Sequence, residues 1–163
     1  MKKWLLLGLA SLLLCGCGAE ETFETVADEE ILSVMAEPRK IAVQLPEGTS
    51  ASVLNREGEQ VYLCEDHEII IETCGAGDLG GTVRHICGYE KGELTLIQTQ
   101  WQDVTRYDFV WASAGEQGDR LGRAVILDDG HYHYCMSVLR DAQGEDARTD
   151  WEAVFASFDL VLT

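Results

Sequence analysis

Apolar and polar residues alternate in short runs along most of the chain after Pro38, and this pattern predicts a mainly antiparallel sheet. Turn residues separate the runs, among them Gly58 and the Asp128-Asp129-Gly130 segment. Because the intervening loops are short, neighbouring strands are expected to pair as hairpins. The predicted strands cover residues 41–45, 52–55, 59–64, 68–74, 106–113, 120–127 and 131–139.

Two other stretches repeat apolar residues at helical spacing. In residues 78–86, Leu79, Val83 and Ile86 fall on one helical face, and Asp78 is suited to cap the helix. Residues 146–157 carry a broader apolar stripe, and a last strand is expected at 159–162. The sequence therefore predicts an α+β domain over residues 39–163, with a mainly antiparallel sheet of about seven to nine strands packed with two helices.

The first residues have the layout of an export signal. A basic start precedes an apolar run at residues 4–14, which is too short to span a bilayer as a helix. Leu14-Cys15-Gly16-Cys17 then resembles the lipobox of bacterial lipoproteins. The resemblance implies that residues 1–16 are a signal peptide and that Cys17 becomes the lipidated first residue. Cys15 is the competing candidate, but Leu14 stands where the pattern requires a small residue.

Acidic residues dominate both the whole chain and the segment after Cys17. Against 12 Lys and Arg stand 29 Asp and Glu, a formal net charge of -17, which excludes nucleic acid as a partner. From Gly18 to Pro38 there are seven acidic residues and no basic one. Residues 17–38 are therefore interpreted as the lipidated cysteine followed by a solvated tether, which spans about 25 Å if flexible.

A function as a lipid-anchored module at the extracytoplasmic face of the cell membrane follows from these features. Acyl chains on Cys17 would hold the chain at the membrane without a basic patch. The domain is expected to be a non-catalytic binding or interaction module for a protein or small molecule, with no cofactor; its oligomeric state stays open. A metal-binding lipoprotein, with zinc or copper, is the alternative, and a hydrolase of surface material comes third.

Two segments also carry a likeness to known envelope domains. Residues 132–139 (YHYCMSVL) and 151–160 (WEAVFASFDL), in the order strands, helix, meander, closing helix and strand, resemble PsbP-like and DcrB-like domains. The resemblance implies an antiparallel sheet packed between helices, outside a bacterial membrane, without catalytic residues. The whole chain is also similar to a group of acidic lipoproteins that brings no activity.

Residues 75–80 (GAGDLG) match the dinucleotide-binding pattern G-x-G-x-x-G between a strand and a helix. That pattern requires a parallel βαβ unit, whereas the preceding strand is predicted to be the second arm of a hairpin. We therefore interpret these glycines as a turn that Asp78 caps.

His131, His133 and Cys135 alternate along one predicted strand, so their side chains leave the same face. Imidazole and thiolate suit zinc or copper, and the Cys64/His67 and His85/Cys87 pairs offer further ligands. The opposite face carries Tyr132, Tyr134, Met136 and Val138, which is typical of a row that faces the core. On that interpretation the two histidines lie on the solvated side.

The cysteines of the domain allow several interpretations. Export makes disulfides chemically feasible, and Cys64, Cys74, Cys87 and Cys135 permit three full pairings, or free buried thiols. A catalytic cysteine with His85 or His133 as its base is a third alternative.

An aromatic stripe offers one more binding candidate. Tyr107, Phe109 and Trp111 form this stripe along one strand, which is typical of a core and less often of a binding face.

Mass spectrometry of the chain from native membranes tests the lipidation of Cys17. We expect a mature chain that begins at this residue and carries acyl chains. An intact Met1 on an unmodified, soluble product would contradict the interpretation and reopen the glycine pattern at residues 75–80.

Overall fold

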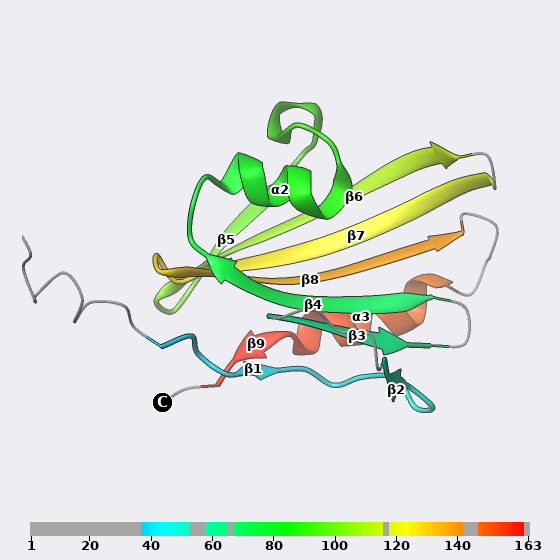
Figure 1. The fold of residues 1–163 in the computed structure, drawn as a ribbon, viewed down its shortest axis with the longest axis horizontal. Helices are drawn as coiled ribbons and strands as arrows, with labels where there is room; N and C mark the ends of the chain where they lie inside the picture. Colours follow the sequence, from blue (N-terminus) through cyan, green and yellow to red (C-terminus); the bar gives the residue numbers. More distant parts are fainter. Residues whose placement is uncertain (1–36, 53–57, 65–66, 116–117, 142–146, 162–163) are drawn as a thin grey trace, which may run out of the picture. The chain divides into compact units, whose positions relative to one another are not determined.

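A seven-stranded antiparallel sheet forms the centre of the fold, with strand order β2-β3-β4-β8-β7-β6-β5 (Figure 1). The computed structural model describes residues 37–52, 58–64, 67–115, 118–141 and 147–161. The strands of this sheet are β2 (Ser50–Ala51), β3 (Glu59–Leu63), β4 (Glu68–Gly75), β5 (Ile97–Trp101), β6 (Val104–Gly115), β7 (Gly118–Asp128) and β8 (Tyr132–Asp141).

The remaining elements pack around this sheet. The short strands β1 (Ile41–Ala42) and β9 (Asp159–Leu160) pair with each other in a separate two-stranded sheet. Three helices complete the described part of the chain: α2 (Leu79–Cys87), the 3-10 helix η1 (Lys91–Glu93) and α3 (Ala147–Ser157). No described helix is long and apolar enough to cross a membrane.

The predicted α+β class is confirmed, and so are both predicted α-helices. The paired strands extend beyond their predicted ends because β6 and β7 continue their ladder to Gly115 and Gly118. The first predicted hairpin arm is displaced: β2 lies at Ser50–Ala51, while residues 53–57 lie outside the described part. Strand β5 was not delimited from the sequence, and its five residues are all exposed.

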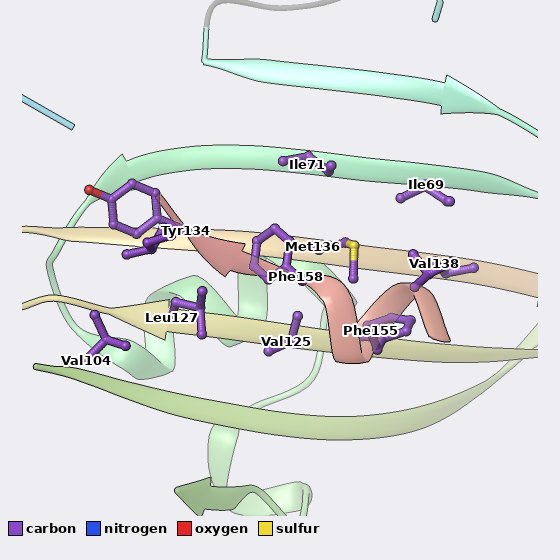
Figure 2. Packing of buried hydrophobic residues seen from close by; sticks show 12 residues of the cluster. Ile69, Ile71, Val104, Val125, Leu127, Tyr134, Met136, Val138, Phe155 and Phe158 are labelled. Atoms are coloured by element: carbon purple, nitrogen blue, oxygen red, sulfur yellow. The ribbon is translucent and has the colours of Figure 1, made fainter. Parts of the chain in front are cut away.

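One face of the sheet packs against α3 and β9 (Figure 2). The core-facing row predicted for the 132–138 segment is confirmed here, because Tyr134, Met136 and Val138 of β8 are buried on this face. Phe155 and Phe158 cover these side chains from the other layer. Burying large apolar side chains such as these contributes about 1.5 to 3 kcal/mol each.

The other face of the sheet packs against α2, and this overturns one expectation. Val83 of α2 lies in a second buried cluster with Phe109, Ile126 and Cys135 of the sheet. The side of β8 that was expected to be solvated is therefore covered: His133 and Cys135 are each only 1% exposed. The alternation along β8 was predicted correctly, but helix α2 replaces the expected solvent.

The glycine-rich segment before α2 works as a turn and helix cap, as the sequence analysis interpreted it. The Asp78 carboxylate accepts a hydrogen bond from the Gly81 N–H at 3.2 Å. At the other end Gly88 adopts a left-handed conformation (φ 80°), and its N–H donates to the Arg84 carbonyl. Strand β4 runs antiparallel to both neighbours, β3 and β8, so the parallel unit of a dinucleotide-binding fold is not formed here.

Arg106 fastens α3 to the sheet. Its guanidinium makes a bidentate pair with Asp108 on the same strand, at 2.8 and 3.1 Å. The same group donates to two carbonyls at the end of α3, that of Phe155 at 2.9 Å and that of Phe158 at 3.2 Å. A cation at a helix C-terminus satisfies carbonyls that have no partner within the helix. Arg106 therefore links β6 to the end of α3 and to the residue that follows it through one planar group.

Replacing Arg106 should destabilise the domain more than removing a surface ion pair. We expect Arg106→Ala to lower the free energy of unfolding by about 2 to 4 kcal/mol, because Asp108 and two carbonyls lose their donor. Urea denaturation followed by circular dichroism measures this difference. The control is Arg84→Ala, which removes only the exposed pair with Glu90 and should lower the free energy of unfolding far less than Arg106→Ala does. Equal losses in the two variants would contradict the role of Arg106.

Candidate functional site

A row of three polar side chains crosses the sheet beneath α2. On the central strand β8, His133 lies directly opposite Cys74 of β4 on one side and Asp128 of β7 on the other. Directly opposite residues project from the same face of an antiparallel sheet. The register of the sheet therefore places a thiol, an imidazole and a carboxylate side by side. This row is called the Cys-His-Asp row below.

Helix α2 closes the row from above. Thr82 of α2 places its Oγ1 2.7 Å from Nδ1 of His133. On the far side of the ring, Nε2 of His133 lies 3.7 Å from Oδ2 of Asp128. Both ring nitrogens thus have a polar neighbour, which a buried imidazole needs. Cys74 remains partly exposed, with its Sγ 3.7 Å from the main-chain carbonyl oxygen of His133.

The electrostatics of the row favour a thiolate on Cys74. Hydrogen bonding from the Cys135 thiol, and then from His133, lowers the pKa of Cys74 to about 4, although burial opposes the charge. Cys135 changes in the opposite sense, because its hydrogen bond to Cys74 and its burial raise its pKa. Hydrogen bonding to Cys74 raises the pKa of His133 against the effect of burial, and Asp128 adds to the rise. Both shifts favour the ion pair of a Cys74 thiolate and a protonated His133 imidazole over the neutral pair.

His85 and Cys87, two residues apart on α2, have different partners. His85 places its Nε2 2.9 Å from Oε2 of Glu72. The thiol of Cys87 donates instead to the Val83 carbonyl at 3.1 Å, and burial raises its pKa. Of the two bases considered from the sequence for a catalytic cysteine, the structure brings only His133 to a thiol.

An open groove continues the same face of the sheet beyond α2, with a volume of about 770 Å³. Ile86 and Cys87 at the end of α2 form one wall. Its floor includes Trp111, whose indole lies so close over Gly122 that a Cβ there would be 2.1 Å from Cε2. The other lining residues are Leu63, Cys64, His67, Glu68, Ile70, Ser113, Arg120, Ser137 and Leu139.

The residues proposed from the sequence as metal ligands do not come together. His131 is exposed at the turn before β8, whereas His133 and Cys135 are buried beneath α2. Within the described ranges, no group of three His, Cys, Asp or Glu side chains is arranged to hold a metal ion. Cys64, Cys74, Cys87 and Cys135 are free thiols. Cys17 lies outside the described residues, so its lipidation stays a prediction.

Two members of the site were not found from the sequence. Asp128 was interpreted only as a turn residue, and it does accept the Gly130 N–H at 2.8 Å. Its second role depends on the register that sets it opposite His133. Thr82 gives even less indication of a role in the site. In the sequence it is only a polar residue next to Val83, at the edge of the apolar helix face. The aromatic stripe divides: Phe109 belongs to the core beneath α2, while Trp111 also lines the groove.

Comparison with known proteins identifies the fold and nothing finer. No profile of a known protein family and no curated protein matches the chain. A crystal structure at 1.50 Å resolution from Bacteroides thetaiotaomicron VPI-5482 is similar in fold, with a TM-score of 0.52 and 13% sequence identity. The match covers 75% of this chain and 45% of that protein, so the chain spans less than half of its structural relative.

Alkylation of the full chain with iodoacetamide, mapped by mass spectrometry, tests the ionisation of Cys74. A thiol reacts as its thiolate, which is the form present above its pKa. We expect Cys74 to react at pH 6 at least about tenfold faster than Cys87, because the two pKa values are shifted in opposite directions.

A variant and a pH series complete this test. Replacing Cys135 by Ala removes the largest cause of the lowered pKa, so the pKa of Cys74 should rise. The rate at pH 6 should then fall and should recover at alkaline pH. A wild-type rate for Cys74 that rises only above pH 8, as for an ordinary thiol, would contradict the thiolate.

Proposed function

We propose that the chain is a lipid-anchored extracytoplasmic binding protein, and that the groove beside α2 is its ligand site. The supporting observation is the groove itself, a hollow of about 770 Å³ on a sheet face that α2 covers only in part. Small-molecule sites typically enclose about 300 to 1,000 Å³, so the size suits a small organic molecule. The lipidated Cys17 and the acidic tether would present this site outside the membrane.

The lining of the groove points to a ligand with an apolar body and a few polar groups. Ile70, Trp111 and Leu139 provide apolar surface, while Ser113 and Ser137 offer hydroxyl groups between them. Apolar surface with a small number of fixed polar groups is the usual composition of such sites. An aromatic or aliphatic body would lie against the indole of Trp111, and the hydroxyls would orient it.

The charge of the protein narrows the class of ligand further. A formal net charge of -17 repels anions at long range and attracts cations. Glu68 lies in the lining and adds a local negative charge, which Arg120 offsets at another point of the rim. We therefore favour an uncharged or cationic molecule over an acidic one.

A photoreactive probe tests the groove in the full, lipid-carrying chain. The probe is an uncharged phenyl diazirine, and peptide mass spectrometry locates its covalent adducts. We expect saturable labelling on β3, β4, β6 and β8 at the residues that line the groove. Ser137→Phe should reduce this labelling at least about fivefold, because the ring fills the floor of the site.

A matched aromatic substitution controls for changes in general apolarity. Val110→Phe adds the same ring on β6 at a side chain that is 65% exposed and outside the groove, so labelling should stay as in the wild type. Circular dichroism must show both variants folded. Labelling spread over the surface, or labelling of the groove that Ser137→Phe leaves unchanged, would refute the proposed ligand site.

A further inference from the structure

We propose that Cys74 and Cys135 form a dithiol centre that exchanges with low-molecular-weight organic disulfides, with Cys74 as the attacking thiol and Cys135 as the resolving thiol. Both residues project from the α2 face of the sheet, on the neighbouring strands β4 and β8. The centre is separate from the groove, whose lining stops at Ile70, four residues along β4 from Cys74. The inference is therefore independent of the proposed function.

The positions of the two thiols suit these two roles. Cys74 is partly exposed and can be reached by a small disulfide, whereas Cys135 is 1% exposed and can be reached only from within the site. His133 lies directly opposite Cys74, its Nδ1 is 2.7 Å from Thr82 Oγ1, and hydrogen bonding to Cys74 raises the pKa of the imidazole. The attacking thiol in exchange reactions is the accessible one with the larger thiolate fraction.

The register of the sheet argues for a reversible bond instead of a permanent one. Cys74 lies opposite His133, and Cys135 lies opposite Glu72, so the two cysteines are diagonal neighbours. Diagonal Cα atoms in antiparallel pairs are about 7 to 8 Å apart, whereas disulfides usually span about 4.4 to 6.8 Å. The strands must shift to form the bond, and a bond under such strain is readily reduced.

The exchange balances in two steps. The Cys74 thiolate attacks one sulfur of an external disulfide, forms a mixed disulfide and releases the other half as a thiolate. Cys135 then gives its proton to that released thiolate and attacks the sulfur of Cys74. This breaks the mixed disulfide and releases the second half of the external molecule. The two cysteines lose two electrons and the external disulfide gains them, so no other oxidant is needed.

The same row of thiol, imidazole and carboxylate also occurs in acyl transfer, where a cysteine attacks a carbonyl group. The second thiol distinguishes the two chemistries. Cys135 is buried on the same sheet face, diagonally next to Cys74 on the neighbouring strand, and a resolving thiol in that position would intercept a cysteine bonded to another sulfur. Acyl transfer makes no use of it, so the observations favour disulfide exchange.

Treating the reduced full chain with dithiodipyridine, followed by peptide mapping, tests the proposal. The wild type should yield an internal Cys74–Cys135 disulfide without a lasting probe adduct, and reduced glutathione should restore both thiols. Cys135→Ala should instead keep the probe on Cys74 as a stable mixed disulfide. Cys74→Ala should slow modification of Cys135 at least about tenfold, because the buried thiol loses its attacking partner. Val110→Ala, at an exposed side chain of β6 outside both the Cys-His-Asp row and the groove, is the control and should behave as the wild type.

The wild-type result decides the matter even if a variant fails to fold. A stable probe adduct on wild-type Cys74, or an internal disulfide that reduced glutathione does not open, would overturn the exchange centre. So would rapid turnover of p-nitrophenyl acetate through Cys74 without formation of the internal disulfide, because this outcome would assign the row to acyl transfer. The diazirine labelling of the groove is unaffected by any of these results.

Discussion

The burial of β8 on both of its faces is the constraint that organises the rest of the structure. Tyr134, Met136 and Val138 pack beneath α3, and on the other face His133 and Cys135 lie beneath α2. A strand covered on one face only can leave His133 and Cys135 in water. In a strand that is covered on both faces, every polar side chain that becomes buried needs a hydrogen-bond partner. The contacts of His133 with Thr82 and Asp128 meet that requirement, and the neighbouring strands are in register to provide them.

The sequence predicted the fold well and the site only in part, for an identifiable physical reason. Alternation along β6, β7 and β8 reports which residues share a face, and those predictions agree with the structure. It does not report what covers a face. His131, His133 and Cys135 were interpreted as a solvated row, because the helix that covers His133 and Cys135 comes from another part of the chain. The pairing of Cys74 with His133 depends on a register between strands more than fifty residues apart, which no local pattern encodes. Strand β5 was also not delimited from the sequence, because all five of its residues are exposed and none of them marks a buried face.

Helix α2 divides one face of the sheet into two environments. With nine residues, it covers the Cys-His-Asp row and ends at Cys87, where Gly88 turns the chain away. His133 and Cys135 beneath the helix are buried, so charge interactions there are strong. The part of the sheet face beyond the helix is open, and Trp111 lines the groove there. The length of α2 thus separates the Cys-His-Asp row from the proposed ligand groove on one continuous sheet.

The pairing of β1 with β9 has a consequence for the order in which the chain acquires its structure. Ile41 lies opposite Leu160, so the first strand of the described domain pairs with the last described strand, far along the chain. Contacts between such distant positions close late and slow folding. The strands of a hairpin such as β6 and β7 are neighbours in the sequence, so their contacts can form early in folding. Until residues 159–160 have been synthesised, β1 therefore lacks this partner and remains an unpaired edge.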